Sequence, residues 1–148
     1  MIKCPFCKSE KSRVLDKRGS SGSIRRRREC QKCKKRFTTY EAIEEPKIFV
    51  IKKDGRRELF NREKLRNSMA KACEKRPVSQ EKIDNAVAEI EQKLKEKGKE
   101  VSSEFVGESV MKKLKTLDKV AYIRFASVYR EFADISEFKR IVGELKTN

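Results

Sequence analysis

Two pairs of cysteines near the start of the chain constrain its fold more than any other feature. Cys4 and Cys7 form one C-x2-C pair, Cys30 and Cys33 form a second, and 22 residues separate the two pairs. Each pair makes a tight turn that directs two sulfurs at one point, and the spacer can hold two antiparallel strands and a turn. Four thiolates suit one tetrahedral zinc ion and leave no open position for water. The spacing therefore predicts one structural zinc site per chain without catalysis, while an iron centre with the same four ligands stays chemically open.

The chain has five cysteines, and the remaining one has a different character. Cysteines that are merely buried or redox-active are the alternative for the first four, and their spacing argues against it. Cys73 falls on the apolar side of a predicted helix, which favours a small core residue over a reactive thiol. No apolar run resembles a signal peptide or a membrane span, so we expect a cytoplasmic protein with reduced cysteines and no membrane partner.

Positive charge is concentrated in the cysteine-rich segment. The net charge is +16, and residues 1–40 alone carry 14 Lys and Arg against three acids. Such an excess favours a polyanionic partner, and arginine pairs well with phosphate or guanine. A solvated charge run is the alternative, and the pattern does not separate DNA from RNA. The candidate nucleic-acid contacts are Arg25, Arg26, Arg27, Arg28, Lys35, Arg36, Thr38 and Tyr40.

An acidic patch and a proline at residues 41–46 mark a boundary between two parts of the chain. Upstream, β-rich runs predict strands over 13–17 and 24–29, joined by a turn over 19–23, with a third strand over 34–40. Downstream, residues 47–53 and 56–60 predict a hairpin around Asp54-Gly55. The period then becomes helical, and we expect a helix near 62–75 capped by Asn61, a second from Ser79 to Gly98 and a third that starts at Ser102 or Ser103 and carries residues up to Leu114. A fourth over 119–132, capped by Asp118, and a fifth near 136–145 follow. A small zinc-bound β domain followed by an α+β domain, a β-hairpin plus four or five helices, is the predicted fold class.

Several of these motifs together resemble a known family. CPFC, then RRRRECQKCKKRFTTYE, closely resembles the zinc ribbon of the NrdR family, the bacterial repressors of ribonucleotide reductase genes. The segments VIKKDGRRELFNREKL, EKRPVS and LDKVAYIRFASVYREF resemble an ATP-cone, a nucleotide-sensing domain. The resemblance runs from Cys4 to about Phe138 and has both halves in the family's order. It implies a zinc-ribbon domain over 1–46, an ATP-cone over 47–138 and a C-terminal helix end and tail over 139–148.

The resemblance also implies a function and its ligands. It implies ATP- or dATP-dependent repression, with Mg²⁺ on the nucleotide, in a homo-oligomer that binds double-stranded operator DNA and is then associated with the nucleoid. Lysines on a hairpin strand and on the first turn of the next helix could converge on a triphosphate, aided by the amides at 62–64. No P-loop motif is present. The implied nucleotide-binding residues are Val50, Lys52, Lys53, Glu58, Asn61, Lys64 and Leu65.

Two other classes of protein are alternatives to a nucleotide-gated repressor. A zinc-ribbon RNA-binding protein with a helical interaction domain would share the basic ribbon, and competition between DNA and RNA would separate the two. An enzyme is a weak alternative, because the chain has no histidine and the predicted metal site is closed. We therefore expect no enzymatic activity and no catalytic residues.

Overall fold

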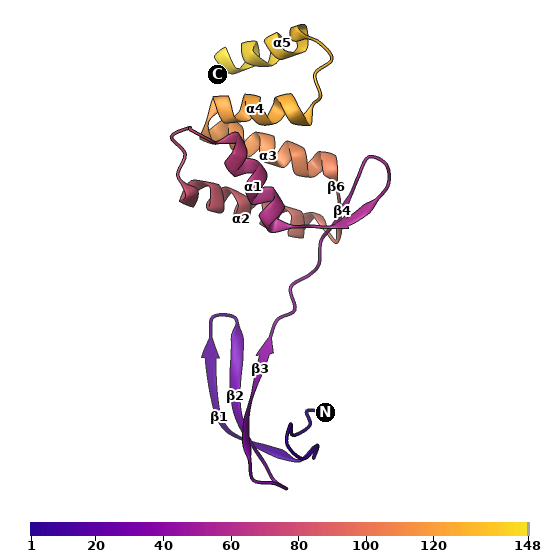
Figure 1. The fold of residues 1–148 in the computed structure, drawn as a ribbon, viewed down its shortest axis with the longest axis vertical. Coiled ribbons are helices and arrows are strands. Elements are labelled where there is room, and N and C mark those ends of the chain that lie inside the picture. Colours follow the sequence, from indigo (N-terminus) through magenta and orange to yellow (C-terminus); the bar gives the residue numbers. More distant parts are fainter. Residues whose placement is uncertain (148) are drawn as a thin grey trace. The chain divides into compact units, whose positions relative to one another are not determined.

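The chain folds into two compact units, residues 1–45 and 46–148. A computed structural model describes residues 1–147 and their side chains other than that of Ser20. Figure 1 shows strands β1 to β3 in the first unit and helices α1 to α5 in the second, with a short extended segment joining the two units. No helix in the described part of the chain is long and apolar enough to cross a membrane.

The first unit is a three-stranded antiparallel sheet with the order β1-β2-β3. The strands are β1 (Ser12–Ser20), β2 (Ser23–Cys30) and β3 (Arg36–Ala42). All three extend beyond the predicted strands at one or both ends, and the β1–β2 turn shrinks to Ser21-Gly22, where both φ angles are positive. A bulge between Val14 and Asp16 shifts the register of β1 by one residue.

A second small sheet lies at the start of the second unit. It has the order β5-β4-β6, with β4 (Phe49–Ile51), β5 (Arg57–Leu59) and β6 (Glu100–Ser102). The predicted hairpin is present with shorter strands, because Lys52–Arg56 form the turn, with a hydrogen bond from Lys52 N to Arg56 O of 2.8 Å. Strand β6 pairs parallel to β4 and was not predicted, since three residues carry too little pattern to mark a strand.

Five helices follow in the predicted order. They are α1 (Arg62–Ala72), α2 (Gln80–Lys97), α3 (Ser103–Leu117), α4 (Lys119–Tyr129) and α5 (Ile135–Lys146). The predicted caps Asn61, Ser79, Ser102 and Asp118 each accept a hydrogen bond from a first-turn amide, which satisfies donors that the helix cannot. Gly98 ends α2 with a φ of 135°, which favours glycine. Helices α1 and α4 end three residues earlier than predicted.

The core of the second unit is built from the predicted helix faces. Helix α2 buries Ile83, Val87, Ile90 and Leu94 at helical spacing, together with Ala86. Helix α1 packs against α2 and α4, and α3 packs against α2 and α4, so these apolar stripes meet in one cluster. Cys73 is 5% exposed and lies in this cluster, where burial raises the pKa of its thiol. The prediction of a small core residue is therefore confirmed.

Asp118 makes the most buried ion pair described in the second unit, and we expect its loss to destabilise the fold. Its side chain is 8% exposed, and both of its oxygens lie 3.0 Å from Arg76 Nε, which donates to them. It also caps α4, because one of these oxygens accepts a hydrogen bond from Ala121 N. The hydrogen bond from Arg76 holds the pKa of Asp118 below its ordinary value. Asp118→Asn should lower the free energy of unfolding by about 2–4 kcal/mol at pH 7, because it leaves Arg76 unpaired.

The contribution of the Asp118 carboxylate to the free energy of unfolding should depend on pH. A carboxylate with a lowered pKa stabilises the folded chain above its unfolded pKa of about 4 and loses that contribution as pH falls through the folded value. The difference between wild type and Asp118→Asn should therefore shrink between pH 5 and pH 2, roughly the span over which such carboxylates protonate. Urea unfolding followed by helical circular dichroism measures it. The control Asp84→Asn removes an ion pair whose carboxylate is 48% exposed, and should cost less than about 1 kcal/mol.

Candidate functional site

The two cysteine pairs sit in matching turns of the first unit. Lys8 N donates to Cys4 O at 2.9 Å, and Lys34 N donates to Cys30 O at 3.0 Å. Lys8 and Lys34 have φ angles of 61° and 62°, so each turn closes in the same left-handed way. The local sequence thus folds both C-x2-C pairs into the same knuckle and directs their sulfurs inward.

The four sulfurs form a cluster of the right size for one zinc ion. The sulfurs of Cys4, Cys7, Cys30 and Cys33 all lie within 4.8 Å of one another. Cys4 and Cys33 are 3.7 Å apart, and Cys7 and Cys30 are 3.6 Å apart. Four sulfurs placed about 2.3 Å from a central zinc in a tetrahedron would be roughly 3.8 Å apart. The donor set and its spacing therefore fit a closed structural zinc site.

The pKa values of Cys30 and Cys33 are shifted in opposite directions. Cys33 N lies 3.5 Å from Cys30 Sγ, and this contact is the main reason that the pKa of Cys30 falls to about 6. An amide contact from Lys35 lowers the pKa of Cys33, but burial and the three neighbouring thiols together raise it to about 11. A divalent ion bound among the four sulfurs would stabilise their thiolate forms, which are the forms that bind zinc.

The cysteine cluster is also the only core that the first unit has. Among its described side chains, only Cys4 and Cys30 are buried. A sheet without an apolar interior cannot offset the entropy lost on folding. We therefore expect metal binding to supply most of the folding free energy of this unit.

The predicted nucleic-acid contacts lie on two strands and one knuckle. Arg25 to Arg28 are consecutive on β2, and Arg36, Thr38 and Tyr40 alternate along β3. Lys35 precedes β3, and its Nζ lies 5.0 Å from the centre of the Phe6 ring in the first knuckle. The register pairs Arg25 with Tyr40 and Arg27 with Thr38, which gathers these four residues on one side of the sheet. Arg26 and Arg28 point to the other side.

A pocket of about 220 Å³ in the second unit collects most of the predicted nucleotide-binding residues. Six of the seven line it: Val50, Lys52, Glu58, Asn61, Lys64 and Leu65, whereas Lys53 does not. Lys52 Nζ and Lys64 Nζ lie 3.6 and 3.8 Å from the same oxygen of Glu58. Two ammonium groups, one from the hairpin turn and one from α1, therefore meet at one point, where a phosphate chain could replace the carboxylate.

The start of α1 opens onto this pocket. Asn61 Oδ1 accepts a hydrogen bond from Lys64 N at 3.0 Å, so that amide is already satisfied. The amides of Arg62 and Glu63 have no acceptor inside the helix, as in any first turn. They remain available to an anion, so two of the three predicted amides keep this role.

Besides Leu59, Phe60 and Ser68, the pocket is lined by residues of two helices that the sequence did not associate with it. Ser103, Val106, Gly107 and Val110 belong to α3, and Phe125 and Tyr129 belong to α4. Gly107 gave the one local signal, since a glycine inside a helix usually has a packing reason. A Cβ at Gly107 would overlap the ring of Tyr129, so glycine lets α4 approach α3 at the pocket wall.

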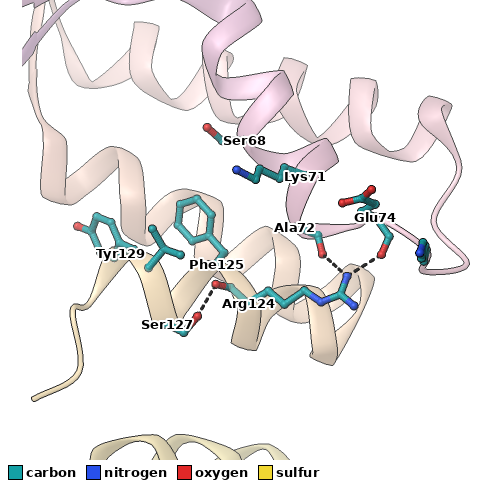
Figure 2. A pocket seen from close by; sticks show the side chains of 10 residues that line it. Ser68, Lys71, Ala72, Glu74, Arg124, Phe125, Ser127 and Tyr129 are labelled. Atoms are coloured by element: carbon teal, nitrogen blue, oxygen red, sulfur yellow. Dashed lines mark hydrogen bonds between the residues drawn. The ribbon is translucent and has the colours of Figure 1, made fainter. Parts of the chain in front are cut away.

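A larger hollow of about 770 Å³ adjoins this pocket and shares Ser68, Phe125 and Tyr129 with it. Figure 2 shows its lining, with the Phe125 side chain of α4 on the side of α1, which carries Ser68 and Lys71. Arg124 donates to the carbonyl oxygens of Ala72 and Glu74, at 3.4 and 2.6 Å. This guanidinium therefore closes the end of α1 and supports the wall of the hollow.

The chain is similar to known proteins over nearly its whole length. Residues 2–41 match the family described as the transcriptional repressor NrdR-like N-terminal domain, and residues 48–135 match the ATP cone domain. A transcriptional repressor NrdR of Kosmotoga olearia is 56% identical over 148 residues, which cover 98% of this chain and 94% of the relative. Repressors of the same name from Petrotoga mobilis and Thermotoga neapolitana are 53% and 56% identical, and cover 99% and 98% of this chain and 100% and 95% of those relatives.

These matches and the cysteine cluster confirm the predicted fold class, a zinc ribbon followed by an α+β ATP-cone domain. They confirm the resemblance on which the nucleotide-site prediction rests. The three relatives are named as regulators of transcription rather than as enzymes, in agreement with the expectation that the chain has no catalytic role.

Proposed function

The chain belongs to the NrdR family of transcriptional repressors, and from this premise we propose that it represses ribonucleotide reductase genes in response to ATP and dATP. In this proposal the zinc ribbon binds double-stranded operator DNA, and the ATP-cone senses the nucleotide. The observation that supports it is the presence, in one chain, of a basic sheet with a four-cysteine cluster suited to zinc and of a pocket lined by two lysines. We keep the domain limits of 1–46, 47–138 and 139–148 as part of the proposal.

The chemistry of the smaller pocket supports an adenine nucleotide as its ligand. Val50, Leu65, Val106 and Val110 give it an apolar interior that suits a purine base. Lys52 and Lys64 give it a cationic rim that suits a triphosphate. Glu58 supplies a carboxylate oxygen, the kind of ligand that Mg²⁺ prefers beside nucleotide phosphates.

A change of assembly is the simplest way for such a pocket to control a separate DNA-binding unit. A ligand shifts an equilibrium between two assemblies only by its difference in affinity for them. ATP and dATP differ at one hydroxyl, so we propose that this hydroxyl decides which homo-oligomer forms and how its ribbons are paired. By linkage, operator DNA should change the affinity for the favoured nucleotide by the same factor. A repressor acts on the chromosome, so we propose a cytoplasmic location in association with the nucleoid.

Binding of the zinc-loaded chain to a reductase promoter fragment with ATP, with dATP and without nucleotide tests this proposal. We expect the three affinities, measured at one stated salt concentration, to differ by at least about fivefold, a typical lower limit for coupling between sites. Equal affinities would contradict nucleotide gating. Preferential binding of a structured RNA competitor would favour an RNA-binding protein instead, and isothermal titration without any heat from ATP or dATP would contradict the sensor.

A further inference from the structure

The ribbon sheet has two faces with different arginines, because side chains alternate along a strand. Directly paired residues of antiparallel strands share a face. We call the side that carries Arg18, Arg25, Arg27, Thr38 and Tyr40 the open face, and the side that carries Arg26, Arg28, Phe37 and Thr39 the closed face. The run of four arginines is therefore divided between the faces, two on each.

The two arginines of the closed face are bound to the next strand. Arg26 Nη2 lies 2.9 Å from Glu41 Oε2, and Arg28 Nε donates to Thr39 Oγ1 at 3.0 Å. The Arg26 side chain is only 29% exposed, and its Nε is buried without a hydrogen-bond partner among the described residues. These contacts join β2 to β3, and each of them takes one nitrogen of its guanidinium group.

The two arginines of the open face have no such partners. Within the described residues, the side chains of Arg25 and Arg27 make no hydrogen bond or ion pair, although Arg27 is exposed and Arg25 is half-buried. Asp16 lies opposite Arg27 in the register, but its carboxylate pairs with Arg18. Arg25 lies directly opposite Arg18 on β1. Like charges placed opposite each other destabilise a sheet, and Arg18 is compensated only by Asp16, at 3.0 Å on the exposed surface. An anion at this place would relieve the repulsion.

The exposure of β3 distinguishes the same two faces. Arg36, Thr38 and Tyr40 are exposed, whereas Phe37 and Thr39, which alternate with them, are half-buried. Tyr40 lies opposite Arg25 and is 70% exposed, a large fraction for an aromatic side chain. An exposed aromatic ring and a hydroxyl beside unpaired guanidinium groups are typical of contacts to nucleic-acid backbones.

At the end of the open face nearest the cysteine cluster, basic side chains are paired with an acidic one. Arg13 and Arg36 both pair with Glu29, at 2.8 and 3.5 Å, and the hydrogen bond from Arg13 lowers the pKa of Glu29. Arg36 is therefore partly engaged, unlike Arg25 and Arg27. The uncompensated charge is centred on the middle of β2.

We propose that the open face is the DNA-contact surface of the ribbon, with Arg25 and Arg27 as its direct contacts, and that Arg26 and Arg28 hold the sheet together instead. The inference rests on the proposed function, which requires that the ribbon bind operator DNA. It divides the predicted arginine contacts into two pairs with different roles. A sheet face of this kind can enter the major groove, where arginine binds guanine bidentately.

Four single variants of the full, zinc-loaded chain test the division. Arg25→Ala and Arg27→Ala should each weaken binding to the promoter fragment by about 10-fold or more and reduce the slope of log affinity against log salt by about one. Arg26→Ala and Arg28→Ala are matched controls from the same strand. Each should change DNA affinity by less than about 3-fold, while the loss of one hydrogen-bonded pair lowers the stability of the ribbon.

Folding of the controls is checked by zinc content and thermal melting. If a closed-face alanine variant loses zinc, the four lysine variants replace the alanines, because lysine keeps the charge and loses the planar fork. Arg25→Lys and Arg27→Lys should still weaken binding, and Arg26→Lys and Arg28→Lys should not. Equal losses on both faces in zinc-loaded variants would overturn the division and leave the repressor proposal intact, whereas a wild-type chain that binds no DNA in any nucleotide state would overturn both.

Discussion

Replacing Cys30 by serine is expected to abolish DNA binding while leaving nucleotide binding unchanged. Cys30 is one of only two buried side chains described in the first unit and belongs to the four-sulfur cluster. Structural zinc contributes on the order of 10 kcal/mol to the folding of small metal domains, far more than a 45-residue sheet without an apolar core can replace. The variant ribbon should therefore lose zinc and unfold, so that its arginines are no longer arranged on the faces of a sheet.

The second unit should stay folded when the ribbon unfolds. The buried residues of its core all lie between Ile48 and Leu145, within residues 46–148. Isothermal titration of ATP or dATP should give the wild-type affinity within about twofold, and the helical circular dichroism signal should persist, since independent sites behave additively.

Cys73→Ala is the matched control for the zinc experiment. It removes the one described cysteine outside the cluster, and it should keep one zinc per chain and the wild-type DNA affinity. Its cost should be confined to a small loss of stability in the helical core, about 1 kcal/mol for a buried sulfur. A Cys30→Ser chain that retains zinc and binds the promoter fragment normally would contradict a structural role for the metal.

Replacing Lys52 by alanine is expected to weaken ATP and dATP binding by roughly 10- to 100-fold. A hydrogen bond from a charged group contributes about 1.5–3 kcal/mol, and Lys52 points into a pocket whose other cation is Lys64. The pair Lys52→Ala and Lys64→Ala should lose more than either alone, since both ammonium groups face Glu58 and would face the same phosphate chain. Isothermal titration at constant Mg²⁺ measures these losses.

Lys93→Ala provides a matched control on α2. Lys93 is an exposed helical lysine that lines neither the smaller pocket nor the larger hollow, so its loss should change nucleotide affinity by less than about twofold. Wild-type affinity in the Lys52 variant would exclude this pocket as the triphosphate site. Because the ribbon is a separate unit, the Lys52 variant should also keep its zinc, and its DNA affinity should become insensitive to added nucleotide.

The ribbon illustrates how much of a site can be inferred from local pattern. The metal ligands followed from two C-x2-C spacings, because each pair acts within a single turn. The alternation of the four arginines followed from strand geometry. Their division into an engaged and a free pair did not, because it depends on Glu41 and Thr39 of another strand.

The nucleotide pocket shows the same limit. Val50, Lys52, Glu58, Asn61, Lys64 and Leu65 lie within 16 residues of one another, so a resemblance in one short segment could indicate them together. Val106, Gly107 and Val110 of α3 and Phe125 and Tyr129 of α4 complete the pocket from at least 40 residues further along. Their apolar pattern predicted helices, but it contained no information about which helix faces the hairpin.

The sequence by itself determined the zinc ligands, the helix caps at Asn61, Ser79, Ser102 and Asp118, and the order of the elements other than β6. All of these depend on groups a few residues apart, whose geometry the backbone nearly dictates. Only the tertiary structure decided the parallel pairing of β6 with β4, the walls of the pocket and the partners of the arginines. These depend on how distant segments pack, and many sequences with the same periodic pattern could pack their helices differently.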